Sequence, residues 1–484
     1  MTASAHPLRR GACPALSAPM QTGDGLLVRL AASGIDIGLD QAAELCAAAR
    51  RHGNGIIEIT ARGNFQIRGL SAASAGAFAD AVAALGIDAG TGVAILVDPL
   101  AGLAPAPAVD GREIAKRLRR ALAASPFAAS LGAKVSCVID GGFALHLDSV
   151  AADIRLRVDG TRWHVAVGGD AGSARGLGWV DAADAVEAAL RLLRVIAQHG
   201  PLARAKDLLG ADGPQVLAAA IAELMCETKD QAPLPIPPPH QRVHARLTPR
   251  YAGREQPAAH AEINQPLAAA RPRAEPIGSH LLRDHSLALG VGPAFGHTDA
   301  TALVRLIETA RNNGVHTLRT APGRALLFIG LTQDTVRPFV TTAERLGFIT
   351  HRDDPRRHVA ACAGAPVCAS AEIPARMLAP LVTAAAATLL DGSLNLHLSG
   401  CRKGCAHPAR STLTIVGSQR GCELIIDGTS TGAAHAVVAT EELLLAIARV
   451  DKAVAQTRGE SSAAAAFARL GPAQVANLFG AADD

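Results

Sequence analysis

Apolar and polar positions follow the same order in two stretches of the chain. In the first stretch, the pattern predicts strands at 26–30, 56–59 and 65–67 and a helix over 40–51 with Ala42, Leu45, Cys46 and Ala49 on one face. In the second stretch, it predicts strands at 287–289, 315–318 and 325–329 and a helix over 299–312. The order strand, helix, strand, strand therefore occurs twice.

Short residue matches accompany this repeated pattern. Ala49-Arg50-x-x-Gly53 corresponds to Ala310-Arg311-x-x-Gly314, and Thr60-Ala61-x-Gly63 corresponds to Thr320-Ala321-x-Gly323. Because such a unit leaves sheet edges and one sheet face to be covered, we expect the two copies to pair about a pseudo-two-fold axis in an α+β fold. The alternative is a chance similarity between two alanine-rich helices.

A mixed α/β region is expected after each copy. Region 91–230 contains a predicted helix over 112–124 and predicted strands at 134–139, 143–147 and 163–167, and region 350–455 contains the closely spaced cysteines. Residues 231–265 carry Pro-Leu-Pro-Ile-Pro-Pro-Pro at 233–239 and few periodic apolar positions, which predicts a linker or an extended strap.

Length and composition narrow the class of protein. A chain of 484 residues with 49% hydrophobic and 19% charged residues is expected to form several compact domains. The formal net charge of +4 makes neither nucleic acid nor an anionic membrane the default partner. No apolar run of 18 residues is present, and residues 1–10 lack an apolar signal-peptide core, so we expect a cytoplasmic protein.

Four of the nine cysteines form two closely spaced pairs. Cys362 and Cys368 make a C-x5-C pair, and Cys401 and Cys405 make a C-x3-C pair. Both pairs are expected on flexible loops flanked by glycine. Loops of this kind suit a 4Fe-4S cluster, which takes one thiolate per iron and accepts backbone N–H bonds at its sulfurs. A structural zinc site or a chance group of thiols are the alternatives, and Cys422 is expected to be a thiol without a metal.

The cysteine spacing, together with the two copies, resembles the sulfite and nitrite reductase superfamily. Within that superfamily, residues 11–29 and Asp98-Pro-Leu-Ala-Gly102 resemble the precorrin-3B synthase family of the aerobic cobalamin pathway. The resemblance implies two pseudo-repeated ferredoxin-like half-domains, each followed by a mixed α/β domain. The expected segments are a half-domain at 11–90, an α/β domain without a cluster at 91–230, a linker at 231–280, a second half-domain at 281–349, an iron-sulfur and tetrapyrrole-binding domain at 350–455 and a helical tail at 456–484.

The same resemblance implies a binding site for a polycarboxylate tetrapyrrole. Arg62 stands where the reductases keep an arginine that faces the macrocycle, and Gln66 is expected to bond pyrrole groups or orient Arg62. Lys134 matches the first lysine of the family's pair, whereas Ser136 replaces the second. Arg402, Lys403 and Cys405 are further candidates for cofactor binding. Residues 92–95 lack the arginine that helps a reductase to bind its small oxyanion.

The implied activity is the hydroxylation of precorrin-3A at C-20 by dioxygen, with formation of a γ-lactone. A cubane ligated by four thiolates offers no open position for dioxygen, so the implied reaction needs a sirohaem-type haem or a mononuclear non-haem iron. Candidate ligands are His280, His285, His297, His316 and His407, although they show no 2-His-1-carboxylate spacing and the alternative for each is an ordinary surface or core histidine. The sequence lacks a dinucleotide fingerprint, so an external NAD(P)H-dependent donor is expected. The alternatives are a sirohaem-dependent sulfite or nitrite reductase and a non-catalytic iron-sulfur protein.

Overall fold

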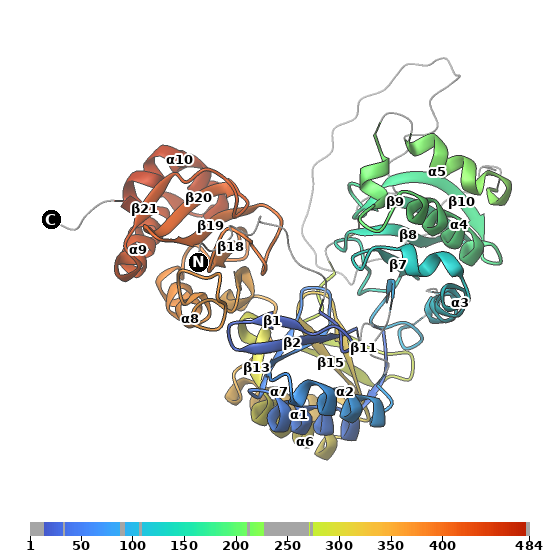
Figure 1. Ribbon diagram of the computed structural model, residues 1–484. Helices are drawn as coiled ribbons and strands as arrows, with labels where there is room; N and C mark the ends of the chain where they lie inside the picture. Colours follow the sequence, from blue (N-terminus) through green and yellow to red (C-terminus); the bar gives the residue numbers. More distant parts are fainter. Residues whose placement is uncertain are drawn as a thin grey trace, which may run out of the picture. The chain divides into compact units, whose positions relative to one another are not determined.

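A computed structural model describes residues 14–31, 34–87, 92–105, 109–210, 213–226, 271 and 274–480 (Figure 1). The chain divides into two compact units. Unit 1 comprises Met1–Thr91, Leu103–Ala106 and Glu275–Asp484, and unit 2 comprises Gly92–Gly102 and Pro107–Ala274. None of the described helices is both long enough and apolar enough to cross a membrane.

The repeat predicted from the sequence forms two similar sheets in unit 1. The first copy consists of β2 (Gly25–Leu30), α1 (Leu39–His52), β4 (Ile56–Ile59), β5 (Phe65–Leu70) and α2 (Ser74–Ala84). The second consists of β12 (Leu287–Pro293), α6 (Ala300–Asn312), β14 (Thr317–Ala321), β15 (Ala325–Leu331) and α7 (Gln333–Arg345). The four helices lie together on one side of the sheets (Figure 1), and apolar residues of both copies share one core.

The two copies exchange short edge strands. β3 (Ile37–Gly38) belongs to the first copy but pairs with β14 of the second. β13 (His297–Asp299) belongs to the second copy but pairs with β4 of the first. The sheets therefore run β1-β2-β5-β4-β13 and β11-β12-β15-β14-β3, with β1 at Met20–Thr22 and β11 at Gly278–Leu281. Each copy therefore supplies one edge strand to the sheet of the other copy, in agreement with a pseudo-two-fold relation between them.

Unit 2 is a five-stranded mixed sheet with helices. Its strands are ordered β10-β9-β8-β7-β6, and β6, β7 and β8 run parallel. Their bounds are β6 Ala94–Val97, β7 Ser136–Asp140, β8 Ala152–Asp159, β9 Arg162–Gly169 and β10 Arg175–Asp181. The helices are α3 (Arg112–Ala123), α4 (Ala185–Gln198) and α5 (Gly213–Ile221).

A second sheet of the same design follows the second copy. Its order is β17-β18-β19-β20-β21, with β17, β18 and β19 parallel. The strands are β17 (Val359–Ala361), β18 (Leu396–Ser399), β19 (Ser411–Ser418), β20 (Gly421–Gly428) and β21 (Ala436–Val438), and the helices are α8 (Ala375–Ala385), α9 (Leu443–Arg458) and α10 (Ala463–Gly480). Each ferredoxin-like copy is therefore followed by a mixed α/β domain, as expected.

Three details differ from the sequence-based expectations. Residues 143–147 form no strand, because the Asp140 carboxylate accepts the N–H groups of Gly142 and Leu147 and bends the chain into a loop. The expected linker at 231–280 lies largely outside the described residues, but its last residues begin β11. The expected tail at 456–484 contributes Phe467 and Phe479 to the core of the cysteine-bearing domain, so it is part of that domain.

Candidate functional site

The two cysteine pairs lie on loops that leave neighbouring parallel strands. Cys362 follows β17, and Cys401 follows β18 after Gly400. β17 and β18 pair in parallel, with Ala361 opposite Leu398, so their carboxyl ends meet at one edge of the sheet. The topology therefore explains why two pairs 32 residues apart in sequence are close in space.

Backbone groups of these loops approach the thiols closely. The N–H of Gly400 donates to the Cys362 Sγ at 3.1 Å. A Cβ on Gly400 would lie 2.7 Å from the Ala371 Cβ, and Gly364 has a left-handed φ of 69°. Glycine is therefore required at both positions for the loops to pack.

The thiols influence one another's ionisation. Burial raises the pKa of Cys362, the N–H groups of Gly400 and Gly364 oppose this rise, and the neighbouring thiols of Cys405 and Cys401 add to it. Burial also raises the pKa of Cys401, with Cys368 acting in the same direction and Lys403 against it. Four neighbouring thiols, of which Cys362 and Cys401 accept backbone N–H bonds, are a donor set that suits an iron-sulfur cluster.

Beside these loops, polar side chains form a row across the first sheet. Strand pairing places His297, Glu58, Gln66 and Arg29 opposite one another on β13, β4, β5 and β2. Because alternate residues such as Ile57, Ile59 and Ile67 enter the helix-covered core, this polar row occupies the opposite face of the sheet. The polar row thus faces away from the core that the two copies share.

The polar row is connected by hydrogen bonds. Arg29 Nη2 donates to Gln66 Oε1 at 2.9 Å, and Gln66 Nε2 donates to Glu58. Glu58 also forms an ion pair with Arg376, the second residue of α8. Both ends of the Gln66 amide are therefore held within the row, which leaves the orientation of Gln66 fixed.

Two further arginines join the row to the cysteine loops. Arg68 makes a two-point ion pair with Asp24 at 2.9 and 3.0 Å, lies 3.7 Å from Glu58, and is close enough to Cys368 for the thiol to affect its pKa. Arg324, which has a left-handed φ of 64°, donates from Nη2 to the carbonyl of Ala406 at 2.9 Å. The polar row and the cysteines thus belong to one region of unit 1.

The remaining predicted residues have varied surroundings. Arg62 is half-buried in the turn between β4 and β5. Arg402 donates to the Gly432 carbonyl at 3.0 Å and pairs with Glu423, and Lys403 donates to Ser370 at 2.8 Å. Lys134 is exposed and belongs to unit 2. Cys405 is the exposed thiol of the four, and Cys422 is buried in the apolar core.

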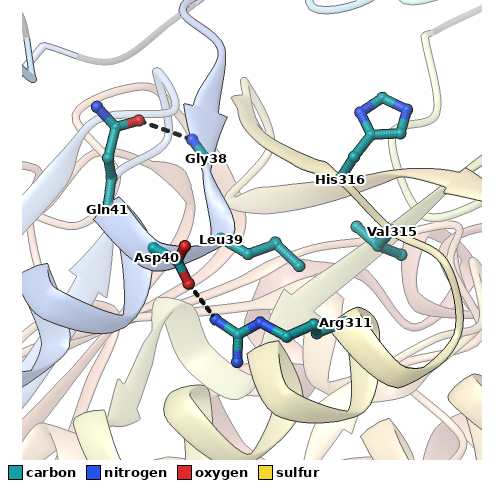
Figure 2. A pocket seen from close by; sticks show the side chains of 7 residues that line it. All are labelled: Gly38, Leu39, Asp40, Gln41, Arg311, Val315 and His316. Atoms are coloured by element: carbon teal, nitrogen blue, oxygen red, sulfur yellow. Dashed lines mark hydrogen bonds and ion pairs between the residues drawn. The ribbon is translucent and has the colours of Figure 1, made fainter.

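The candidate histidines are dispersed among different elements. His297 lies in the polar row, where burial and the charge of Arg376 lower its pKa to about 4. His407 lies edge-on to His397 with ring centroids 5.8 Å apart, and His280 bonds the Pro276 carbonyl. His316 lines a surface pocket of about 410 Å³ between α1 and α6, together with Asp40 and Arg311 (Figure 2).

Within unit 2, the ligand atoms of Asp140, His146 and Asp148 lie within 4.8 Å of one another. Neither residue spacing nor periodicity in the sequence points to this group. Arg271 pairs with both carboxylates, and its bonds lower the pKa of Asp148 although burial acts to raise it. The group is therefore a charge network that joins Arg271 to the sheet of unit 2.

Glu58, Arg324 and Arg376 were likewise not among the residues predicted for the site. The sequence does mark Glu58, because it is a charged residue within the apolar strand Ile56-Ile57-Glu58-Ile59. No sequence pattern marks Arg376, because its contact with Glu58 depends on where α8 begins relative to β4.

Comparison with known proteins agrees with this architecture. Residues 18–85 match the family model of the nitrite/sulfite reductase ferredoxin-like half domain. The fold is similar to the structure of the Mycobacterium tuberculosis NirA protein, with a TM-score of 0.70 and 18% identity over 93% of this chain and 84% of that one. A precorrin-3B synthase of a Sinorhizobium species is 38% identical over 98% of this chain and 95% of its own length. The chain therefore belongs to the precorrin-3B synthase family.

Proposed function

We propose that this enzyme hydroxylates precorrin-3A at C-20 with dioxygen and forms a γ-lactone from the ring A acetate, as a step of cobalamin biosynthesis. The similarity to a precorrin-3B synthase over nearly the whole of both chains carries this proposal. A monooxygenase reaction puts one oxygen atom into the substrate and reduces the other to water with two electrons. An external NAD(P)H-dependent donor supplies these electrons in the cytoplasm.

Cys362, Cys368, Cys401 and Cys405 are proposed to hold a 4Fe-4S cluster. The positions of Cys362 and Cys401 after two parallel strands, the nearby thiols of Cys368 and Cys405, and the Gly400 N–H bond to Cys362 support this assignment. The cluster would supply electron transfer. A second iron group, either a sirohaem-type haem beside Cys405 or a mononuclear non-haem iron, is proposed for the reaction with dioxygen.

Basic side chains are proposed to bind the acetate and propionate groups of the tetrapyrrole. Arg62 is the principal candidate, because a planar guanidinium can bind a carboxylate through two parallel hydrogen bonds. Gln66, held by Arg29 and Glu58, is proposed to present a fixed polar edge to the macrocycle. Arg402, Lys403 and Lys134 are assigned cofactor-binding or substrate-binding roles on the resemblance to the superfamily.

Isotope labelling tests the reaction. Precorrin-3A, incubated with the reduced protein and 18O-labelled dioxygen, should give a lactone product with one labelled oxygen at C-20, detected by mass spectrometry. Label that enters from water, or turnover without dioxygen, would exclude a monooxygenase. Sulfite serves as the control substrate, because its rapid reduction to sulfide would instead favour a sirohaem-dependent reductase.

A further inference from the structure

The two pseudo-repeated sheets differ in one row of side chains. In the second sheet, the residues that correspond to the polar row are Asp36 beside β3, Arg319 on β14, Leu327 on β15 and Gly290 on β12. Arg319 is 1% exposed and pairs with Asp36 at 2.5 Å, and a Cβ on Gly290 would lie 1.6 Å from the Pro276 carbonyl oxygen. This second row is therefore closed by its own contacts.

The polar row of the first sheet has an excess of positive charge around it. Arg29 belongs to the row, and Arg68, Arg324 and Arg376 lie beside it. Among the described residues, Glu58 and Asp24 are the carboxylates that interact with these last three arginines. His297 is neutral near pH 7, because burial and the nearby Arg376 disfavour its charged form. The excess charge favours an anionic ligand.

Arg376 has a hydrogen-bonding group left over. Its Nη2 pairs with Glu58, while its Nη1 is buried and has no hydrogen-bond partner among the residues that the structure describes. A buried guanidinium N–H without an acceptor costs free energy, and buried donors are nearly always satisfied in folded proteins. The partner of Nη1 is therefore expected to be an acceptor supplied by a bound molecule.

We propose that Arg376 binds a carboxylate of the tetrapyrrole substrate through Nη1 and that Glu58 is a positioning residue, which holds the guanidinium through Nη2. This inference rests on the proposed function, which supplies a substrate rich in carboxylates. Under this proposal the two copies have different roles, because the polar row of the first sheet binds the ligand and the corresponding row of the second sheet is closed by its own contacts.

Binding of uroporphyrin III, a stable tetrapyrrole with acetate and propionate groups, tests the role of Arg376. The full chain, purified anaerobically, is titrated by absorbance and fluorescence quenching. Arg376→Ala should raise the Kd about 10- to 100-fold, since a hydrogen bond to a charged group is lost. Arg376→Lys keeps the charge but not the planar geometry and should give an intermediate Kd. Arg311→Ala, which breaks the exposed ion pair with Asp40, is the matched control and should bind as the wild type does.

A double-mutant cycle tests the role of Glu58. Glu58→Gln should weaken binding in the wild-type background and have no further effect when combined with Arg376→Ala. Equal effects in both backgrounds, or tighter binding by Glu58→Gln alone, would contradict a positioning role. Circular dichroism of each variant shows whether the fold is retained.

The outcomes separate this inference from the proposed function. If the wild type binds neither uroporphyrin III nor precorrin-3A, both fail. If the wild type binds uroporphyrin III and both Arg376→Ala and Arg376→Lys bind it with the wild-type Kd, only the inference fails. It also fails if Arg376→Ala loses iron and acid-labile sulfide while its Kd is unchanged, because the acceptor for Nη1 would then belong to the metal group.

Discussion

At the scale of single residues, the environments of the cysteines separate two kinds of thiol. Cys362 and Cys401 lie in loops where N–H groups donate toward sulfur and other thiols are near, whereas Cys422 has its Sγ 4.0 Å from Thr440 in an apolar core. Burial raises the pKa of Cys422 to about 11 and also raises the pKa values of Cys362 and Cys401, so the two kinds of thiol differ in their neighbouring thiols and not in burial. The sequence spacing alone had already distinguished these groups.

Cys401→Ser should therefore lose most of the iron and acid-labile sulfide and bleach the visible absorption of the purified protein. The same result is expected for Cys362, Cys368 and Cys405, because a cubane needs all four thiolates. Cys422→Ala is the control and should retain the full iron content. Normal iron in Cys401→Ser, with a loss in Cys422→Ala, would reverse the assignment.

At the scale of elements, the sequence predicted the longer helices and strands and missed the contacts that depend on the fold. β4 coincides with its predicted bounds, because alternation over four residues is a local property. β3 and β13 have only two and three residues, so they carry no periodic signal and form through pairing with the other copy. Residues 143–147 alternate like a strand, yet hydrogen bonds from the chain to Asp140 keep them in a loop. For the site, the ligand role of the four cysteines stays a prediction from their spacing, whereas the contact between Arg376 and Glu58 depends on the position of α8.

Arg271 should contribute to the stability of unit 2 in a pH-dependent manner. Arg271→Met removes the cation that pairs with the wholly buried Asp140 and with Asp148, while Arg155 and His146 stay near Asp148. This change should lower the free energy of unfolding by about 3 kcal/mol at pH 7. The bonds from Arg271 lower the pKa of Asp148 despite the opposing effect of burial, so this stabilisation is present above about pH 4 and is lost as the pH falls through the lowered pKa. The difference between variant and wild type should therefore shrink in acid.

Tryptophan fluorescence during urea unfolding measures this effect selectively. Both tryptophans of the chain, Trp163 and Trp179, lie in unit 2. Arg191→Ala, which removes an exposed pair with Glu187, is the control and should leave the unfolding midpoint unchanged. An equal loss of stability at pH 7 and pH 3 in Arg271→Met would argue against the charge network.

At the scale of the whole molecule, the duplicated design places different chemistry at equivalent positions. In unit 2, Asp98 follows β6 and Asp140 ends β7, whereas in the second α/β domain Cys362 follows β17 and Cys401 lies beyond β18. The first pair of loops contains a carboxylate network closed by Arg271, and the second contains thiols. The two halves are thus alike in topology and distinct in the groups that they gather.

A chain cut within residues 233–239 should reassemble from its two parts. Each part alone lacks an edge strand of one sheet, since β13 completes the first sheet and β3 the second, and the apolar core of unit 1 is divided between them. Co-expressed parts should therefore elute together in size-exclusion chromatography, with circular dichroism like that of the intact chain. A C-terminal part that is monomeric and as heat-stable as the whole protein would show that the exchange is dispensable.

The exchanged strands also determine when the two copies can pair during synthesis on the ribosome. After β4 has been synthesised, roughly 240 residues must be added before His297–Asp299 can pair with it, which takes roughly 10 to 50 s at about 5–20 residues per second. During this interval the edge of β4 has no native partner strand, and an unpaired edge is a template for aggregation. The nascent chain is therefore expected to depend on chaperones until the second copy emerges, and this dependence should be strongest in fast overexpression.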